Sequence, residues 1–214
     1  MKILAFTDIH GSIKHSGYIA PHETLKILDN FKKEVKEQKI GLIVCTGDFT
    51  LFGDHIELLI KKIASLGAEV LLIHGNHEDE TDMKILTKRY PNIEFLHKKM
   101  KKIGDYVFIG YGGGGFSRRD PEFVAAMKKL TSKLSKNDKI ILLTHGPPYG
   151  TKIDYLPGYG HVGSQDYREF IEKHNVVIAL SGHIHEGFGK HEKIKNALVM
   201  DPGPMGKIIE LKQQ

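Results

Sequence analysis

The sequence predicts an α/β fold in which buried strands alternate with helices. Five short, continuous apolar runs are rich in β-branched residues, which is typical of strands buried on both faces of a parallel sheet. Segments with helical periodicity lie between them, so right-handed crossovers would join the strands. The five runs are residues 2–7, 42–46, 69–74, 139–144 and 176–181.

Local start and stop signals place the helices between these strands. Pro21 suits the first turn of the first helix, and Asp54 is expected to cap the second, which Gly67 would end. The third helix would stop before Pro91. The predicted helices cover residues 22–38, 55–66, 81–90 and 164–174.

The C-terminal part predicts short strands joined by turns rather than further crossovers. We expect strands at residues 187–191, 197–200 and 207–211, which would join a strand at 106–110 in a second sheet packed on the first. The lysine-rich run at residues 98–102 is expected to lie in a solvated hairpin turn rather than in a nucleic-acid groove.

A short polar cluster follows each of the five buried strands. Ligands in α/β sheets collect at the carboxyl ends of the strands, so these clusters would converge in space. Taken singly, each has a structural explanation, such as a helix cap, a turn or a core histidine. Their joint occurrence favours a site for two divalent metal ions, because together they offer carboxylates, an amide and imidazoles. The clusters are Asp8-Ile9-His10, Gly47-Asp48, Gly75-Asn76-His77-Glu78, His145-Gly146 and Gly182-His183-Ile184-His185.

This ordered set of clusters resembles the calcineurin-like metallophosphoesterase superfamily, and in particular its compact branch without accessory domains. The resemblance spans nearly the whole chain. It implies a four-layer α-β-β-α sandwich with mixed sheets, formed by one domain over residues 1–214.

The resemblance also implies a role for each polar residue. One metal ion would be held by Asp8, His10 and His185, the other by Asn76, His145 and His183, with Asp48 bridging both. Manganese is the expected ion, although iron, zinc, cobalt and nickel also accept nitrogen and oxygen ligands. Two carboxylates against two divalent ions leave a positive surplus that attracts phosphate.

The mechanism expected from this arrangement is in-line hydrolysis of a phosphate ester. A hydroxide bridging the metals would attack phosphorus, while His77 protonates or hydrogen-bonds the leaving oxygen. Glu78 is its sequence neighbour and is predicted to orient the imidazole as a supporting residue. The expected substrates are nucleotides or small organic phosphate esters, with phosphodiesters favoured over monoesters because the chain is compact.

Two loops supply further candidates for contact with the substrate. His161 lies in the glycine-rich loop after His145, and loops that arch over a strand end often carry binding residues. Arg118 and Arg119 follow the four glycines at 112–115 and could clamp phosphate. These glycines lack the Gly-Lys-Ser/Thr ending of a nucleotide-binding P-loop, so a flexible bend is the simpler interpretation.

Composition narrows the class of protein without identifying it. The 214 residues carry a net charge of +5, which favours anionic partners, nucleic acid among them. No signal peptide or membrane span is evident, so a cytoplasmic protein is expected. A single cysteine, Cys45, excludes an internal disulfide and a thiolate-rich zinc site. The oligomeric state is not predicted.

Two alternative functions remain open at this point. A nuclease would be favoured if residues 98–102 faced the active site. A non-catalytic metal-binding scaffold would be expected to have degraded metal motifs. His10, His77, His183 and His185 are all in place, which argues against the scaffold.

Overall fold

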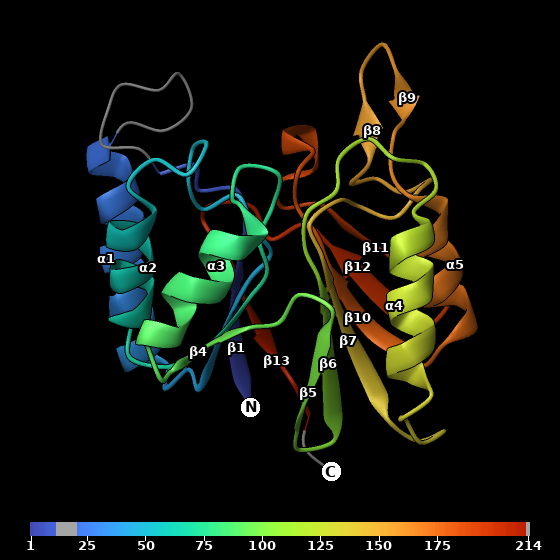
Figure 1. Cartoon of the computed structure of the whole chain (residues 1–214), viewed down its shortest axis with the longest axis horizontal. Helices are drawn as coiled ribbons and strands as arrows, with labels where there is room; N and C mark the ends of the chain where they lie inside the picture. Colours follow the sequence, from blue (N-terminus) through green and yellow to red (C-terminus); the bar gives the residue numbers. More distant parts are fainter. Residues whose placement is uncertain (12–20, 213–214) are drawn as a thin grey trace.

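A computed structural model describes residues 1–11 and 21–212 of the chain. Two β-sheets pack face to face and helices cover both outer faces, giving an α-β-β-α sandwich (Figure 1). The helices α1, α2 and α3 flank the first sheet, and α4 and α5 flank the second. The predicted fold is therefore confirmed. Their bounds are α1 Pro21–Glu37, α2 Ile56–Ala64, α3 Glu80–Leu86, α4 Pro121–Thr131 and α5 Gln165–Lys173.

Both sheets are mixed: their inner strands are parallel, and three of the four edge strands, β13, β11 and β5, are antiparallel to their neighbours. The first has the order β13-β1-β2-β3-β4, in which β1 to β4 are parallel and β13 is antiparallel to β1. Its strands are β1 Lys2–Phe6, β2 Leu42–Cys45, β3 Glu69–Leu72, β4 Ile93–Phe95 and β13 Lys207–Glu210.

The second sheet has the order β11-β12-β10-β7-β6-β5. The four inner strands are parallel, and β11 and β5 are antiparallel to their neighbours. Its strands are β11 His191–Ile194, β12 Ala197–Met200, β10 Val176–Leu180, β7 Lys139–Thr144, β6 Tyr106–Tyr111 and β5 Lys99–Ile103. Smaller elements are β8 Tyr155–Leu156, β9 Gly160–His161 and the 3-10 turns η1 Thr87–Arg89 and η2 His185–Gly187.

Strand β1 shows why continuous apolar runs are needed in this fold. Leu4 and Phe6 pack in the core between the first sheet and its helices, while Ile3 and Ala5 pack in the core between the sheets. Successive side chains point to opposite faces, so a strand buried on both faces has no position for a polar residue. A third core lies between the second sheet and its helices.

Several expected elements are corrected by the structure. The strand predicted at 207–211 is β13, which pairs with β1 in the first sheet rather than joining the second. Residues 187–191 are not a strand, because η2 occupies their start and β11 begins only at His191. The lysine-rich run is mainly the edge strand β5 rather than a turn. Helix α2 has His55, not Asp54, at its N-cap, without a side-chain hydrogen bond.

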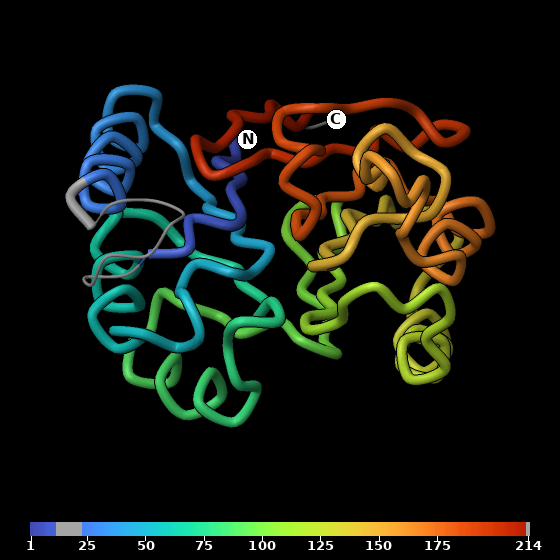
Figure 2. Tube along the Cα trace, turned by 90° about the horizontal axis from the view of Figure 1, so that it is seen from above, coloured from blue at the N-terminus to red at the C-terminus, as the bar shows by residue number. Residues whose placement is uncertain are grey.

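The parallel strands of both sheets direct their carboxyl ends to the same end of the molecule. The five predicted strands are divided between the sheets, with β1, β2 and β3 in the first and β7 and β10 in the second. Figure 2, seen from above, shows most of the N-terminal half of the chain on one side and most of the later strands and helices on the other, while β13 returns to the first sheet. The loops that carry the polar clusters therefore face one another across the interface. Within the described residues, no helix is long and apolar enough to cross a membrane.

Candidate metal centre

Loops from both sheets line a cavity of about 240 Å³ at the carboxyl ends of the strands. The first sheet contributes His10, Asp48, Asn76 and His77, and the second contributes His183 and His185. Asp8 and His145 lie directly beneath these residues and are almost fully buried. The structure thus brings together all seven predicted metal ligands and His77.

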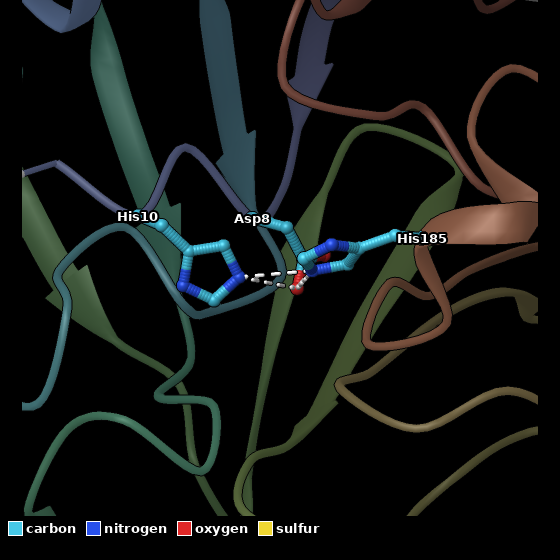
Figure 3. Close-up of side chains that lie close together, drawn as sticks. All are labelled: Asp8, His10 and His185. Atoms are coloured by element: carbon cyan, nitrogen blue, oxygen red, sulfur yellow. Dashed lines mark hydrogen bonds and ion pairs between the residues drawn. The ribbon is translucent and has the colours of Figure 1, made fainter. Parts of the chain in front are cut away.

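Asp8, His10 and His185 form the first group of potential ligands (Figure 3). The Nε2 atoms of the two histidines are 3.0 Å apart. Asp8 Oδ1 lies 3.6 Å from Nε2 of His10 and 3.8 Å from Nε2 of His185. The three side chains point toward one another from β1 and from the far sheet, so one ion could contact all three.

Asp48 connects this group to a second one made with His145 and His183. Its Oδ2 atom lies 3.2 Å from Nε2 of His145 and 3.9 Å from Nε2 of His10. Asn76 joins the second group, because its Oδ1 is 3.0 Å from Nε2 of His145. The two groups have the composition that the sequence resemblance assigns to two metal ions.

Four of these residues have positive φ angles, a backbone conformation that residues other than glycine rarely adopt. The φ angles are 52° at Asp8, 47° at His10, 50° at Asp48 and 73° at His183. Such a conformation costs energy and persists only where the surroundings enforce it, and it is enriched at functional sites. At these four positions the strained turns carry potential ligands to the cavity.

Hydrogen bonds to Nδ1 distinguish His145 from His77. Nδ1 of His145 lies 2.9 Å from the carbonyl oxygen of Thr46 and donates its proton there, so in the neutral imidazole the lone pair of Nε2 is available to a metal. Nδ1 of His77 instead accepts the N–H of Phe52 at 3.2 Å. The proton of neutral His77 therefore resides on Nε2, which makes this atom a hydrogen-bond donor rather than a metal ligand.

Glu78 braces the loops rather than orienting His77, which corrects the expected contact. Its Oε2 accepts the backbone N–H groups of Asp48 and Gly75, both at 2.9 Å. Its Oε1 accepts the backbone N–H and the hydroxyl of Thr50, both at 2.8 Å. This buried carboxylate joins the turn after β2 to the turn after β3 and so fixes the position of Asp48.

Gly182 and Gly75 have no side chain, which leaves space for the carboxylates of Asp8 and Asp48. A Cβ atom at Gly182 would lie 2.1 Å from Oδ2 of Asp8, and one at Gly75 would lie 2.0 Å from Oδ1 of Asp48. Neither distance is possible for real atoms. Any side chain at these positions would displace a potential ligand.

Burial and close pairing shift the pKa values of the site in opposite directions. Burial raises the pKa of Asp48, but the neighbouring His145 outweighs this effect and lowers it to about 2. Burial lowers the pKa of His145, yet the Asp48 carboxylate raises it to about 9. Burial lowers the pKa of His183 to about 4, so this imidazole is neutral near pH 7.

The donor set fits a pair of divalent ions. Nε2 of His183 is buried and has no hydrogen-bond partner within the described part of the chain, which is costly unless another group binds it. Carboxylate, amide and imidazole donors without thiolate suit manganese, iron, zinc, cobalt or nickel. Asp48 belongs to the second group, and its Oδ2 also lies 3.9 Å from Nε2 of His10 in the first.

A separate cluster of His74, Glu80 and His97 has the spacing but not the protonation of a metal site. Nδ1 of His97 accepts the N–H of Gly112 at 2.8 Å, so Nε2 carries the proton. That proton faces the Glu80 carboxylate at 3.6 Å. A metal on Nε2 would need the opposite tautomer and would leave the Gly112 N–H without its acceptor.

The three predicted substrate-contacting residues lie outside the cavity lining. Arg119 forms ion pairs with Asp166 at 2.6 Å and with Glu169 at 2.7 Å, so its guanidinium is engaged with α5 rather than with the metal site. Arg118 stacks on the ring of Tyr149, with its guanidinium carbon 4.4 Å from the centroid. Nδ1 of His161 lies 2.7 Å from the carboxylate of the fully buried Asp154.

Sequence reasoning missed the residues that complete the lining, namely Phe116, Leu156, Ile184 and Glu186. Ile184 and Glu186 are sequence neighbours of the predicted ligand His185, so the sequence already indicates that they lie near the site. Phe116 and Leu156 come from loops whose direction no local pattern indicates.

Comparisons with known proteins agree with this geometry. Residues 1–187 match the family model described as calcineurin-like phosphoesterase. An uncharacterized protein of Methanocaldococcus jannaschii is 34% identical over 219 residues, covering 98% of this chain and 91% of that protein.

Solved structures share the fold at low sequence identity. A dimetal phosphatase from Danio rerio has a TM-score of 0.67 at 10% identity, covering 95% of this chain and 87% of that chain. GAP50, described as the anchor in the inner membrane complex of Plasmodium, has a TM-score of 0.60 at 13% identity, covering 96% and 72%. These likenesses concern the arrangement of the backbone.

Proposed function

Because the chain belongs to the calcineurin-like phosphoesterase family, we propose that it hydrolyses phosphodiesters with two divalent metal ions. The observation that carries this proposal is the pair of ligand groups joined by Asp48. Its Oδ2 atom faces His10 on one side and His145 on the other. One carboxylate placed in this way can serve two ions at once.

The proposed ligands are those expected from the sequence. Asp8, His10 and His185 would hold one ion, Asn76, His145 and His183 the other, and Asp48 both. When bound, such ions activate water as a nucleophile and stabilise negative charge on the phosphoryl oxygens. Manganese is the proposed ion, and iron, zinc, cobalt and nickel remain compatible with this donor set.

His77 has the geometry of a hydrogen-bond donor to the substrate. Its Nε2 lies 3.7 Å from Oδ2 of Asp48, at the edge of both ligand groups. Phe52 occupies its Nδ1, so Nε2–H is directed to the site. We assign to His77 the stabilisation of charge that develops on the leaving oxygen.

The preferred substrates are diesters of nucleotides or small organic phosphates. A diester presents two ester groups around one phosphoryl centre, and the cavity offers two different surroundings for them. His77 lies near His10, with ring centroids 4.7 Å apart, whereas Phe116 lies beside His183 at 4.8 Å. One ester group could therefore leave at His77 while the other rests near Phe116.

A nuclease is the second candidate, and the lysine-rich run gives it little support. Lys98 pairs with Glu122, Lys101 with Glu94, and Lys102 with Asp138. These pairs reduce the positive charge available to a phosphate backbone. A diesterase activity that falls steeply with rising salt would favour the nuclease.

A panel assay tests the proposal. The metal-stripped protein would be supplied with manganese, iron, zinc, cobalt or nickel and given a chromogenic phosphodiester or phosphomonoester. We expect turnover with at least one ion and faster turnover of the diester. Faster monoester turnover would reverse the substrate preference, and absence of turnover with every ion would overturn the enzymatic function.

A further inference from the structure

Phe116 lies at the mouth of the metal cavity with 63% of its surface exposed. Large exposed side chains are common when isolated, but this one contacts a proposed metal ligand. The centroid of its ring is 4.8 Å from that of His183. The other largely exposed phenylalanine, Phe52, does not line the cavity and packs against the ring of His77 at 4.2 Å.

The segment that carries Phe116 is anchored on both sides. Before it, the N–H of Gly113 donates to the carbonyl of His74 at 2.8 Å. After it, the N–H of Gln165 donates to the carbonyl of Arg118 at 2.9 Å. Phe116 is therefore presented at the cavity by a span fixed at its two ends.

The two arginines reinforce this second anchor. Nη2 of Arg118 donates to the carbonyl of His161 at 3.2 Å while its guanidinium stacks on Tyr149. Arg119 is held by Asp166 and Glu169 of α5. The two arginines therefore do not contact the cavity themselves but hold in place the loop that carries Phe116.

The cavity has a polar floor and an apolar lip. Imidazoles and the Asp48 carboxylate form the floor, where phosphate would be bound. The lip consists of the exposed Phe116 and the partly exposed Leu156, and the buried Ile184 is the third apolar residue of the lining. A phosphate held by the floor would place one of its ester groups against this lip.

We propose that Phe116 selects substrates whose retained ester group is a planar aromatic ring. The inference rests on the proposed function and adds the substrate class. The leaving ester belongs at His77, which lies near His10, so the ester beside Phe116 and His183 is the one that stays on phosphorus. An aromatic ring gains from stacking on Phe116 in addition to its burial, whereas a saturated ring of similar size gains only the burial.

Two diesters with the same p-nitrophenyl leaving group test this selection. One carries a phenyl group as the retained ester, and the other a cyclohexyl group. We expect kcat/KM to favour the phenyl diester by roughly three- to tenfold, mainly through KM, since aromatic pairs contribute modestly beyond burial. Phe116→Leu should abolish this preference and Phe116→Tyr should keep it. An unchanged preference in Phe116→Leu, or no preference in the unaltered protein, would overturn the proposal.

A control variant and a binding measurement separate this proposal from the proposed function. Tyr159 is 80% exposed and does not line the cavity, so Tyr159→Leu should leave the preference intact. Calorimetry with the metal-loaded protein would compare phenyl phosphate with cyclohexyl phosphate. If no diester is hydrolysed, the proposed function fails, and tighter binding of phenyl phosphate that is lost in Phe116→Leu would still support the selection. Equal binding of the two phosphates would contradict it.

Discussion

Phe52 donates its backbone N–H to Nδ1 of His77 across 3.2 Å. This contact fixes the proton of neutral His77 on Nε2, the atom that faces Asp48 at 3.7 Å. His145 shows the reverse arrangement, because its Nδ1 faces the carbonyl of Thr46. In their neutral forms the two histidines therefore present opposite tautomers, which suits the proposed role of His77 as a donor to substrate and of His145 as a metal ligand.

The first prediction separates these two tasks. His77→Ala should lower kcat by about 10²- to 10³-fold, the usual loss when one donor to developing charge is removed. Its metal content, measured by plasma mass spectrometry, should stay at the level of the unaltered protein. His145→Ala should lose metal as well as activity. Metal loss in His77→Ala would show that His77 is a ligand and that its proposed role is wrong.

The second prediction concerns the shared carboxylate. Asp48→Asn preserves the shape of the side chain and the oxygen that accepts the N–H of His77 at 2.9 Å. It removes the negative charge that both ions would share, so we expect the bound metal to fall below two ions per chain. Calorimetric titration of the stripped protein with manganese would measure the stoichiometry. Two ions bound to Asp48→Asn with unaltered affinity would contradict the bridging role.

The third prediction uses a pair of glycines. Gly182→Ala would place a methyl group 2.1 Å from Oδ2 of Asp8, so the carboxylate must move and the ion held with His10 and His185 should bind more weakly. Gly41→Ala is the matched control, since a Cβ there meets nothing within 4 Å. Metal titrations of both variants check this expectation. Equal metal affinity in the two variants would show that the site tolerates the added methyl group.

Much of this architecture follows from patterns that are local in sequence. The continuous apolar run of β1 predicts a strand buried on both faces, and Asp8 follows it directly. The division of the strands between two sheets depends on pairing over long distances in sequence, and the strand run alone does not specify it. Thus β13 pairs with β1, which lies about two hundred residues earlier in the chain.

The convergence of the predicted ligands could be expected from the sequence, but their supporting contacts could not. Strand ends place Asp48 and Asn76 at one edge of the first sheet, which the alternation of strands and helices already indicates. The partners of Glu78 depend on the turn geometry of two separate loops. Helix α4 shows a missed signal, since Asp120 caps it and Pro121 occupies its first turn, as the general rules for helix starts expect.

The last prediction tests the bracing role of Glu78. Its two oxygens accept four hydrogen bonds, two from the turn after β2 at Thr50 and one each from the N–H groups of Asp48 and Gly75. In Glu78→Gln one oxygen becomes an NH2 group, so at least one buried N–H loses its acceptor. We expect the free energy of unfolding to fall by about 1–3 kcal/mol.

Urea denaturation of the metal-free protein measures this loss without a contribution from bound metal. Glu57→Gln is the matched control, because Glu57 is exposed and pairs with the exposed Arg89. That pair should contribute at most about 1 kcal/mol. If Glu78→Gln were as stable as Glu57→Gln, the four hydrogen bonds would not stabilise the loops. A loss of stability together with weaker metal binding would show that one buried carboxylate fixes both the turns and the ligand that they carry.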